Sequence, residues 1–305
     1  MKALKFFLLT LISTTIFATD FGVSSEGHIA QGNDITFTSN IAIPVSTAVT
    51  ESARDAVKLA DGTLLVYNGS ASPMLSIYAN NIWENLSFTG WSTANNVSYG
   101  GIASNERFVW VTDMNTSGGI DNHLHGIIQF DLDDQISDFR FAEDIDPIDL
   151  TLGKDGYLYA LYPGGSPSGR YIDVFNPVDA SYIKTISLAD IFGHIAHRSI
   201  AVDAQSNVYI ADWDGDIQMI DSSNNVISTI NVGSSLYDVD IVDNKIISGD
   251  RFGKIYIADL GLLNYQEIEL VNLDSSFNGQ GVFILGDSVD TSQINNELLF
   301  EDGFE

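Results

Sequence analysis

The chain has 305 residues, no cysteine, and 41 acidic against 13 basic residues, which gives a formal net charge of −28. The absence of cysteine excludes a disulfide framework, a thiolate metal site and a cysteine nucleophile. Such an acidic surface repels nucleic acid and anionic membranes, so neither is an expected partner. The charge could attract cations or keep an extracellular protein soluble in a salty medium, and we favour solubility.

A secretory signal peptide is predicted over residues 1–18. Lys2 and Lys5 precede a short apolar run, and the small residue Ala18 comes directly before Thr19. An N-terminal membrane anchor is the alternative, but the run is short and rich in Ser and Thr. No other segment approaches the ~18 apolar residues that a membrane helix needs. We therefore expect a secreted or periplasmic monomer that is not inserted in a membrane.

The sequence then repeats one strand pattern five times. The third strand of each copy ends at an Asp or Asn, at spacings of 51, 45, 45 and 38 residues. A period of about 40–50 residues with four short strands per unit is typical of a β-propeller blade. These third-strand ends are Asn80, Asp131, Asn176, Asp221 and Asp259.

Each unit opens with an apolar first strand that leads by a tight turn into the second strand. Asp61-Gly62 and Asp155-Gly156 are the clearest hairpin signals. Helical periodicity is missing, and only 188–192 could form a single turn. The first strands are expected at 56–60, 101–104, 149–153, 199–203, 238–242 and 281–285, and the second strands at 61–68, 105–113, 155–162, 206–213 and 243–250.

The sixth unit is divided between the two ends of the chain. The C-terminus offers one strand after 281–285, at 296–300, and the N-terminus offers two, around 28–30 and 35–43. Joining them predicts an all-β, six-bladed propeller of four-stranded antiparallel blades, within one domain over 19–297. Five or seven blades are the alternatives. Residues 298–305 are either the last strand or a C-terminal sorting tag.

One repeat resembles a known family. Residues 199–203, 207–212 and 216–221 read SIAVD, NVYIAD and DIQMID, similar to the NHL repeat G-I-A-V-D-x-x-G-N-V-Y-V-A-D. Ser206 stands where the NHL repeat has its usual glycine. The resemblance implies the six-bladed superfamily that includes gluconolactonase-like and paraoxonase-like hydrolases, streptogramin lyase and proteins that only bind partners. It therefore implies a fold without implying one function.

A ring of aspartates is expected on one face of such a propeller, where first strands begin and second strands end. Hard oxygen ligands at one opening suit Ca²⁺. The lactonases of the superfamily bind a divalent metal there through Glu, Asn and Asp, but this chain has no Glu at a first-strand entry. The alternative is that these side chains cap turns and face water. The candidate metal ligands are Asp55, Asp113, Asp149, Asp212, Asp238 and Asp250.

Histidine and turn motifs give weaker signals. His197 precedes a first strand and could act as a general base at the channel mouth, or it could serve packing alone. The pair His123 and His125 could begin a transition-metal site, although a solvated loop is favoured. The run 212–216, Asp-Trp-Asp-Gly-Asp, lacks the order and distal Glu of a calcium loop, so a hairpin is favoured.

Two functions follow from these observations. The favoured interpretation is an exported, acidic β-propeller that binds an extracellular or periplasmic protein or a small ligand on one face, without catalysis. The alternative is a calcium-dependent, lactonase-like hydrolase or lyase, with the aspartate ring as its metal site and His197 as its base.

Overall fold

The structure, a computed structural model, is all-β apart from two short helices among the residues it describes. It describes residues 20–25, 28–33, 37–42, 55–68, 75–86, 100–105, 107–113, 126–132, 137–142, 146–162, 170–193, 196–273 and 281–289. The predicted signal peptide, the strand at 296–300 and the C-terminal tail lie outside these ranges. So do His123, His125 and His194.

Four sheets have four antiparallel strands each, in chain order from the centre outwards. The first contains β8 (Ile102–Ser104), β9 (Phe108–Asp113), β10 (Gly126–Asp131) and β11 (Ser137–Phe141). The second contains β12 (Asp149–Leu152), β13 (Leu158–Tyr162), β14 (Tyr171–Phe175) and β15 (Tyr182–Ser187). The third contains β16 (His197–Val202), β17 (Val208–Asp212), β18 (Asp216–Ile220) and β19 (Val226–Asn231). The fourth contains β20 (Leu236–Val242), β21 (Lys245–Asp250), β22 (Lys254–Asp259) and β23 (Tyr265–Glu269).

A fifth sheet has eight strands and joins the two ends of the chain, in the order β3-β2-β1-β24-β4-β5-β6-β7. β1 pairs antiparallel with β24, and β24 pairs parallel with β4 through three residue pairs. Its N-terminal strands are β1 (Asp20–Ser25), β2 (His28–Asn33) and β3 (Phe37–Ala42), its C-terminal strand is β24 (Phe283–Asp287), and the others are β4 (Asp55–Lys58), β5 (Leu64–Tyr67), β6 (Leu75–Ala79) and β7 (Ile82–Leu86).

The N-terminus supplies three strands to this sheet, so the prediction of two was wrong. β1 was missed because its sequence, DFGVSS, has little apolar content. Gly22 lets it approach β24 closely, since a Cβ at this position would lie 2.4 Å from the Leu285 side chain. Only glycine fits so tight a pairing.

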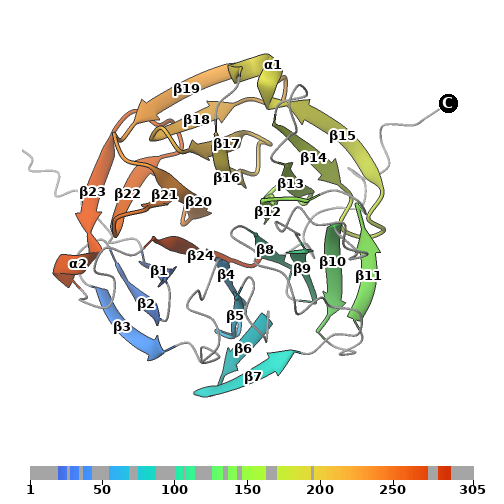
Figure 1. The fold of residues 1–305 in the computed structure, drawn as a ribbon, viewed down its shortest axis with the longest axis vertical. Coiled ribbons are helices and arrows are strands. Elements are labelled where there is room, and N and C mark those ends of the chain that lie inside the picture. The colour runs from blue at the N-terminus through green and yellow to red at the C-terminus, as the bar shows by residue number, and fades with distance from the viewer. Residues whose placement is uncertain are drawn as a thin grey trace, which may run out of the picture.

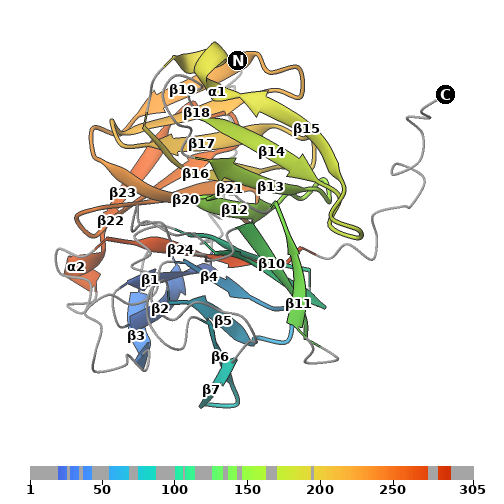
Figure 2. The same cartoon turned by 45° about the vertical axis from the view of Figure 1, so that its right-hand side comes forward.

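The sheets stand around a common centre, as Figure 1 shows down the short axis of the molecule. The inner strands contact one another in sequence, β4 to β8, β12, β16, β20 and β24, and β24 returns to β4. The outermost strands lie on the rim of the molecule, and Figure 2 shows that strands such as β15 run obliquely along this rim. In each sheet the inner strands are largely buried, whereas β15 and β19 expose most of their residues.

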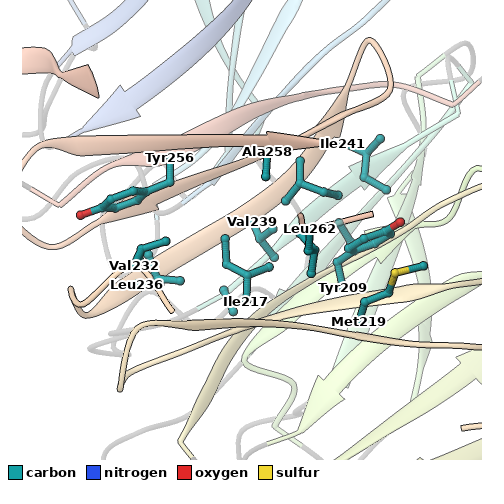
Figure 3. Close-up of a cluster of buried hydrophobic side chains, with 13 residues drawn as sticks. Tyr209, Ile217, Met219, Val232, Leu236, Val239, Ile241, Tyr256, Ala258 and Leu262 are labelled. Carbon is teal, nitrogen blue, oxygen red and sulfur yellow. The ribbon is translucent and has the colours of Figure 1, made fainter. Parts of the chain in front are cut away.

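Apolar side chains fill the spaces between neighbouring sheets. Figure 3 shows the cluster between the β16–β19 sheet and the β20–β23 sheet, where Tyr209, Ile217, Val239 and Tyr256 interlock. Each fully buried side chain of this size contributes about 1.5–3 kcal/mol to folding. Because neighbouring sheets cover both faces of each sheet, second strands such as β13 and β17 are buried along their whole length.

Two helical turns complete the described structure. α1 (Leu188–Phe192) is the single turn predicted from the sequence, and the Ser187 side chain accepts a hydrogen bond from the Asp190 amide at its start. α2 (Leu270–Leu273) was missed because four residues carry no periodic signal. Among the described helices, neither has the length or the apolar character to span a bilayer.

Candidate functional site

The inner strands surround a cavity of about 550 Å³, a volume that includes its opening to solvent. Its walls combine aliphatic side chains with carboxylates, and Lys154 is the basic residue in its lining. The carboxylates that line it are Asp55, Asp149, Asp238, Asp240 and Asp287. Three of the six predicted metal ligands therefore lie together in this channel.

Asp238 on β20 forms hydrogen bonds to the inner strands on both sides, β16 and β24. Its Oδ2 accepts a hydrogen bond from the Ile284 amide of β24 at 2.6 Å. Its Oδ1 accepts from the Val239 amide at 2.8 Å and from the Ser199 hydroxyl of β16 at 2.6 Å. Both carboxylate oxygens are thus used within the protein.

The same bridge recurs at two other inner strands. Asp55 on β4 accepts from the Ile102 amide of β8 at 2.8 Å and from its own neighbour, Ala56, at 2.7 Å. Asp149 on β12 accepts from the Ile200 amide of β16 at 2.7 Å. A hydrogen bond contributes about 0.5–1.5 kcal/mol between neutral groups and about 1.5–3 kcal/mol to a charged group. We call Asp55, Asp149 and Asp238 the channel aspartates.

The channel aspartates alternate around the ring. The other three inner strands donate the amide hydrogens of these bridges. In them, the residue before the bridged isoleucine is Gly101, Ser199 or Phe283. A carboxylate therefore stands on every second inner strand and reaches the next one. Because the amides it binds lie 46 to 51 residues away in sequence, the bridges close long segments of chain.

Burial and mutual repulsion raise the pKa values of the channel carboxyls. Burial, then the charge of Asp238, raises the pKa of Asp149 to about 8. The same two causes raise the pKa of Asp240 to about 7, against the opposing charge of Lys154. Burial is also the main cause of the raised pKa values of Asp55 and Asp238. At neutral pH the channel therefore holds protons that free aspartates would release.

Asp212 and Asp250 lie outside this channel lining and hold turns. The Asp250 Oδ1 accepts from the Phe252 and Lys254 amides, and its Oδ2 accepts from the Ser234 hydroxyl at 2.5 Å. The Asp212 Oδ1 likewise accepts from the second and fourth following amides, those of Asp214 and Asp216. These contacts match the turn-capping alternative for both residues and the hairpin interpretation of 212–216.

The sixth predicted ligand is Asp113, which ends β9, and its side chain lies outside the described part of the structure. Within the described residues, no group of three or more His, Asp and Glu side chains is placed to hold a metal ion. The channel aspartates already accept amide hydrogens, which leaves fewer of their oxygen lone pairs to coordinate a calcium ion. The calcium site stays a prediction.

His197 begins β16 but is fully buried and is not part of the channel lining. Burial, then the charge of Arg170, lowers its pKa to about 4, so the imidazole is neutral at pH 7. The Phe192 ring lies 5.5 Å away, and the Arg170 guanidinium donates a hydrogen bond to the His197 carbonyl. These contacts fit a packing role, and the general-base role stays a prediction.

Sequence reasoning missed a second group of residues on the same face as the strand starts. The pairing of β16 with β17 shifts between His197 and Ser199, which makes Arg198 a bulge residue. The pairing of β20 with β21 shifts in the same way around Tyr237. A bulge redirects the side chain of its extra residue. No short-range pattern marks such a bulge, because it is a property of strand register.

Both bulge residues contact Trp213, which lies in the turn after β17. The Arg198 guanidinium lies 4.4 Å from the centroid of the Trp213 ring, and the Tyr237 ring stands nearly perpendicular to the Trp213 ring with the two centroids 5.8 Å apart. Arg251, from the turn after β21, approaches the same ring at 5.6 Å. We call Arg198, Trp213, Tyr237 and Arg251 the arginine–aromatic cluster.

No protein-family model matches the chain, and neither does any curated protein sequence. One chain of the crystal structure of a nidogen/laminin complex superposes with a TM-score of 0.65 at 12% identity, covering 87% of this chain and 98% of that one. The Pan2 WD40 domain of Neurospora crassa gives 0.52 at 10% identity, over 80% of this chain and 73% of that chain. The fold is that of a β-propeller. The propeller prediction is confirmed, and at these identities the likeness concerns the fold alone.

Proposed function

We propose that the chain is an exported, six-bladed β-propeller that binds a partner or ligand on one face. The count of six rests on packing within the eight-stranded sheet. Ile29 and Leu285 from its terminal half form an apolar cluster with Ala56, Leu64 and Val66 from the other half. The two halves thus pack face to face as the other neighbouring sheets do, and each contributes four strands. Export rests on the predicted signal peptide at 1–18.

The observation that supports the binding role is that hydrogen bonds join the inner strands into a ring and that held turns project from one side of this ring. The channel aspartates join one inner strand to the next, which favours a rigid platform. Asp212 and Asp250 hold the turns after β17 and β21 in fixed conformations. Residues displayed on rigid turns lose little conformational entropy on binding. We call this side of the ring, where inner strands begin, the turn face.

A photocrosslinking experiment tests this role. A photoreactive amino acid replaces Phe252, which is 57% exposed on the turn face, or Ile227, which is 54% exposed on the outermost strand β19. The matched exposure makes the second variant a control. In the culture medium and periplasm of the producing cells, we expect adducts at Phe252 and none at Ile227. Adducts at neither position, or at Ile227 alone, would contradict binding on the turn face.

The calcium-dependent hydrolase or lyase is the second candidate, favoured by the five carboxylates that share one cavity. A thermal melt of the mature protein with Ca²⁺ and with chelator tests it, because a bound ion stabilises the folded state by mass action. This candidate requires micromolar Ca²⁺ to raise the Tm and an Asp149→Asn/Asp238→Asn variant to lose the increase. An unchanged Tm would remove it.

A further inference from the structure

The arginine–aromatic cluster repeats one arrangement on two neighbouring sheets. Arg198 and Tyr237 are the bulge residues of inner strands β16 and β20. Trp213 and Arg251 directly follow the aspartates that end second strands β17 and β21. Each sheet therefore contributes one residue from a bulge and one from a turn, and in each case one is an arginine and the other is aromatic. The pairings of β4 with β5 and of β12 with β13 contain no such shift.

The contacts within the cluster orient its two guanidinium groups. Both lie within about 6 Å of the Trp213 ring centroid, where the ring quadrupole attracts a cation. The Tyr237 ring packs against the Trp213 ring and also against the Phe283 ring, with the centroids 5.8 Å apart in both pairs. Arginines held in this way lose less side-chain entropy when they bind a planar anion. Arg251 is exposed, and Arg198, Trp213 and Tyr237 are partly exposed.

The surroundings restrict what such an anion can be. Two of the chain's 13 basic residues lie on one ring, while its formal net charge is −28. Asp214, in the same turn as Trp213, is exposed. A long polyanion would be repelled by the acidic surface, whereas one or two carboxylates on an otherwise neutral segment carry little charge to be repelled and can pair with a guanidinium group. Phe252 adds an exposed apolar side chain next to Arg251.

We propose that the arginine–aromatic cluster is the binding site for a peptide segment of a partner that presents a carboxylate next to an apolar side chain. The guanidinium groups of Arg198 and Arg251 bind the carboxylate, and Phe252 packs against the apolar side chain. This inference rests on the proposed binding function and specifies which part of the turn face carries it. It requires no metal and no catalytic step.

The test is a selection of random displayed octapeptides on the mature protein, with an Arg198→Gln/Arg251→Gln variant as the counter-target. The control variant, Lys245→Gln/Lys254→Gln, removes the same charge from surface ion pairs with Asp259 and Glu267. We expect recovered peptides to be enriched in Asp or Glu beside apolar residues. Their affinity should fall at least tenfold in the arginine variant and stay within twofold in the control.

Three results would overturn the proposal. One is the recovery of no peptides, and another is recovery of peptides that bind the arginine variant as tightly as the native protein. The third is competition by polygalacturonate or heparin at matched charge, which would identify the ligand as a polyanion. Because Arg198 is partly buried, Arg251→Gln alone is also measured, and a thermal melt verifies that each variant is folded. Adducts at Phe252 that persist in the arginine variant would contradict this inference while supporting the binding function.

Discussion

The channel and the turn face contain the same residue type but use it differently. In the channel, Asp55, Asp149 and Asp238 accept amide hydrogens from neighbouring inner strands and so close the ring. On the turn face, Asp212 and Asp250 accept amide hydrogens from within their own turns. The single aspartate ring predicted from the sequence therefore contains two groups with different structural roles. One group joins neighbouring strands, and the other holds turns and so fixes the positions of other side chains.

Removing a channel aspartate should have the largest effect on stability. Asp238→Ala leaves the Ile284 amide without its acceptor. It leaves the Val239 amide only the Ser199 hydroxyl oxygen at 3.1 Å, and the Ser199 hydroxyl only the Val239 carbonyl at 3.4 Å. One unsatisfied amide and two weakened hydrogen bonds should together lower the free energy of unfolding by about 3 kcal/mol. Urea denaturation measures it, with the exposed Asp214→Ala as a control. A change below 1 kcal/mol would show that the bridge does not close the ring.

Removing a turn aspartate should affect both stability and peptide binding. Asp250→Ala takes the acceptor from the Phe252 and Lys254 amides, which should lower the free energy of unfolding by about 2 kcal/mol. It should also weaken peptide binding, because the turn that carries Arg251 loosens. Denaturation and fluorescence anisotropy measure the two effects. Full retention of affinity would show that turn rigidity does not matter for binding.

The raised pKa values in the channel predict that stability rises as the pH falls from 8 to 6.5. Asp149 and Asp240 have folded pKa values of about 8 and 7, against an ordinary value of 3.8. The folded state therefore binds more protons than the unfolded state in this window, and the gain in the free energy of unfolding is roughly 2 kcal/mol. His197, with its pKa lowered to about 4, acts weakly in the opposite direction as the pH approaches 6.5 and more strongly below it.

An Asp240→Asn variant isolates this effect, because Asp240 forms none of the three bridges between inner strands. Its stability should depend less on pH between 6.5 and 8 than that of the native protein. Chemical denaturation at several pH values measures both slopes. A native stability that is flat or that falls on acidification through this window would contradict the assigned protonation of the channel.

The smallest effect is expected at a turn on the opposite face, outside both regions. Ser206 occupies the left-handed backbone region with φ of +60°, where the NHL repeat has glycine. Ser206→Gly should raise the free energy of unfolding by less than about 1 kcal/mol. Glycine adopts this conformation without steric cost, but the variant loses the side-chain hydrogen bond between Ser206 and Asp155. A thermal melt tests the gain, and peptide binding should not change.

The sequence predicted the strands much better than the site. Alternating apolar residues and turn signals placed the inner strands within two residues of their positions, because these signals are local. The bridge from Asp149 to Ile200 spans 51 residues, and no local pattern encodes it. Arg198 and Tyr237 project from bulges that depend on strand register. β1 was missed because its place depends on the close contact of Gly22 with Leu285.

The most direct test measures stability and binding together in two variants, one from each region. Asp55→Ala removes the channel bridge between β4 and β8, and Arg251→Gln removes a guanidinium from the turn face. We expect Asp55→Ala to lower the Tm and to leave the affinity for the selected peptide within twofold. We expect Arg251→Gln to leave the Tm unchanged and to reduce that affinity severalfold or more. The reverse pattern, with binding lost in Asp55→Ala and stability lost in Arg251→Gln, would contradict the division between a structural channel and a binding face.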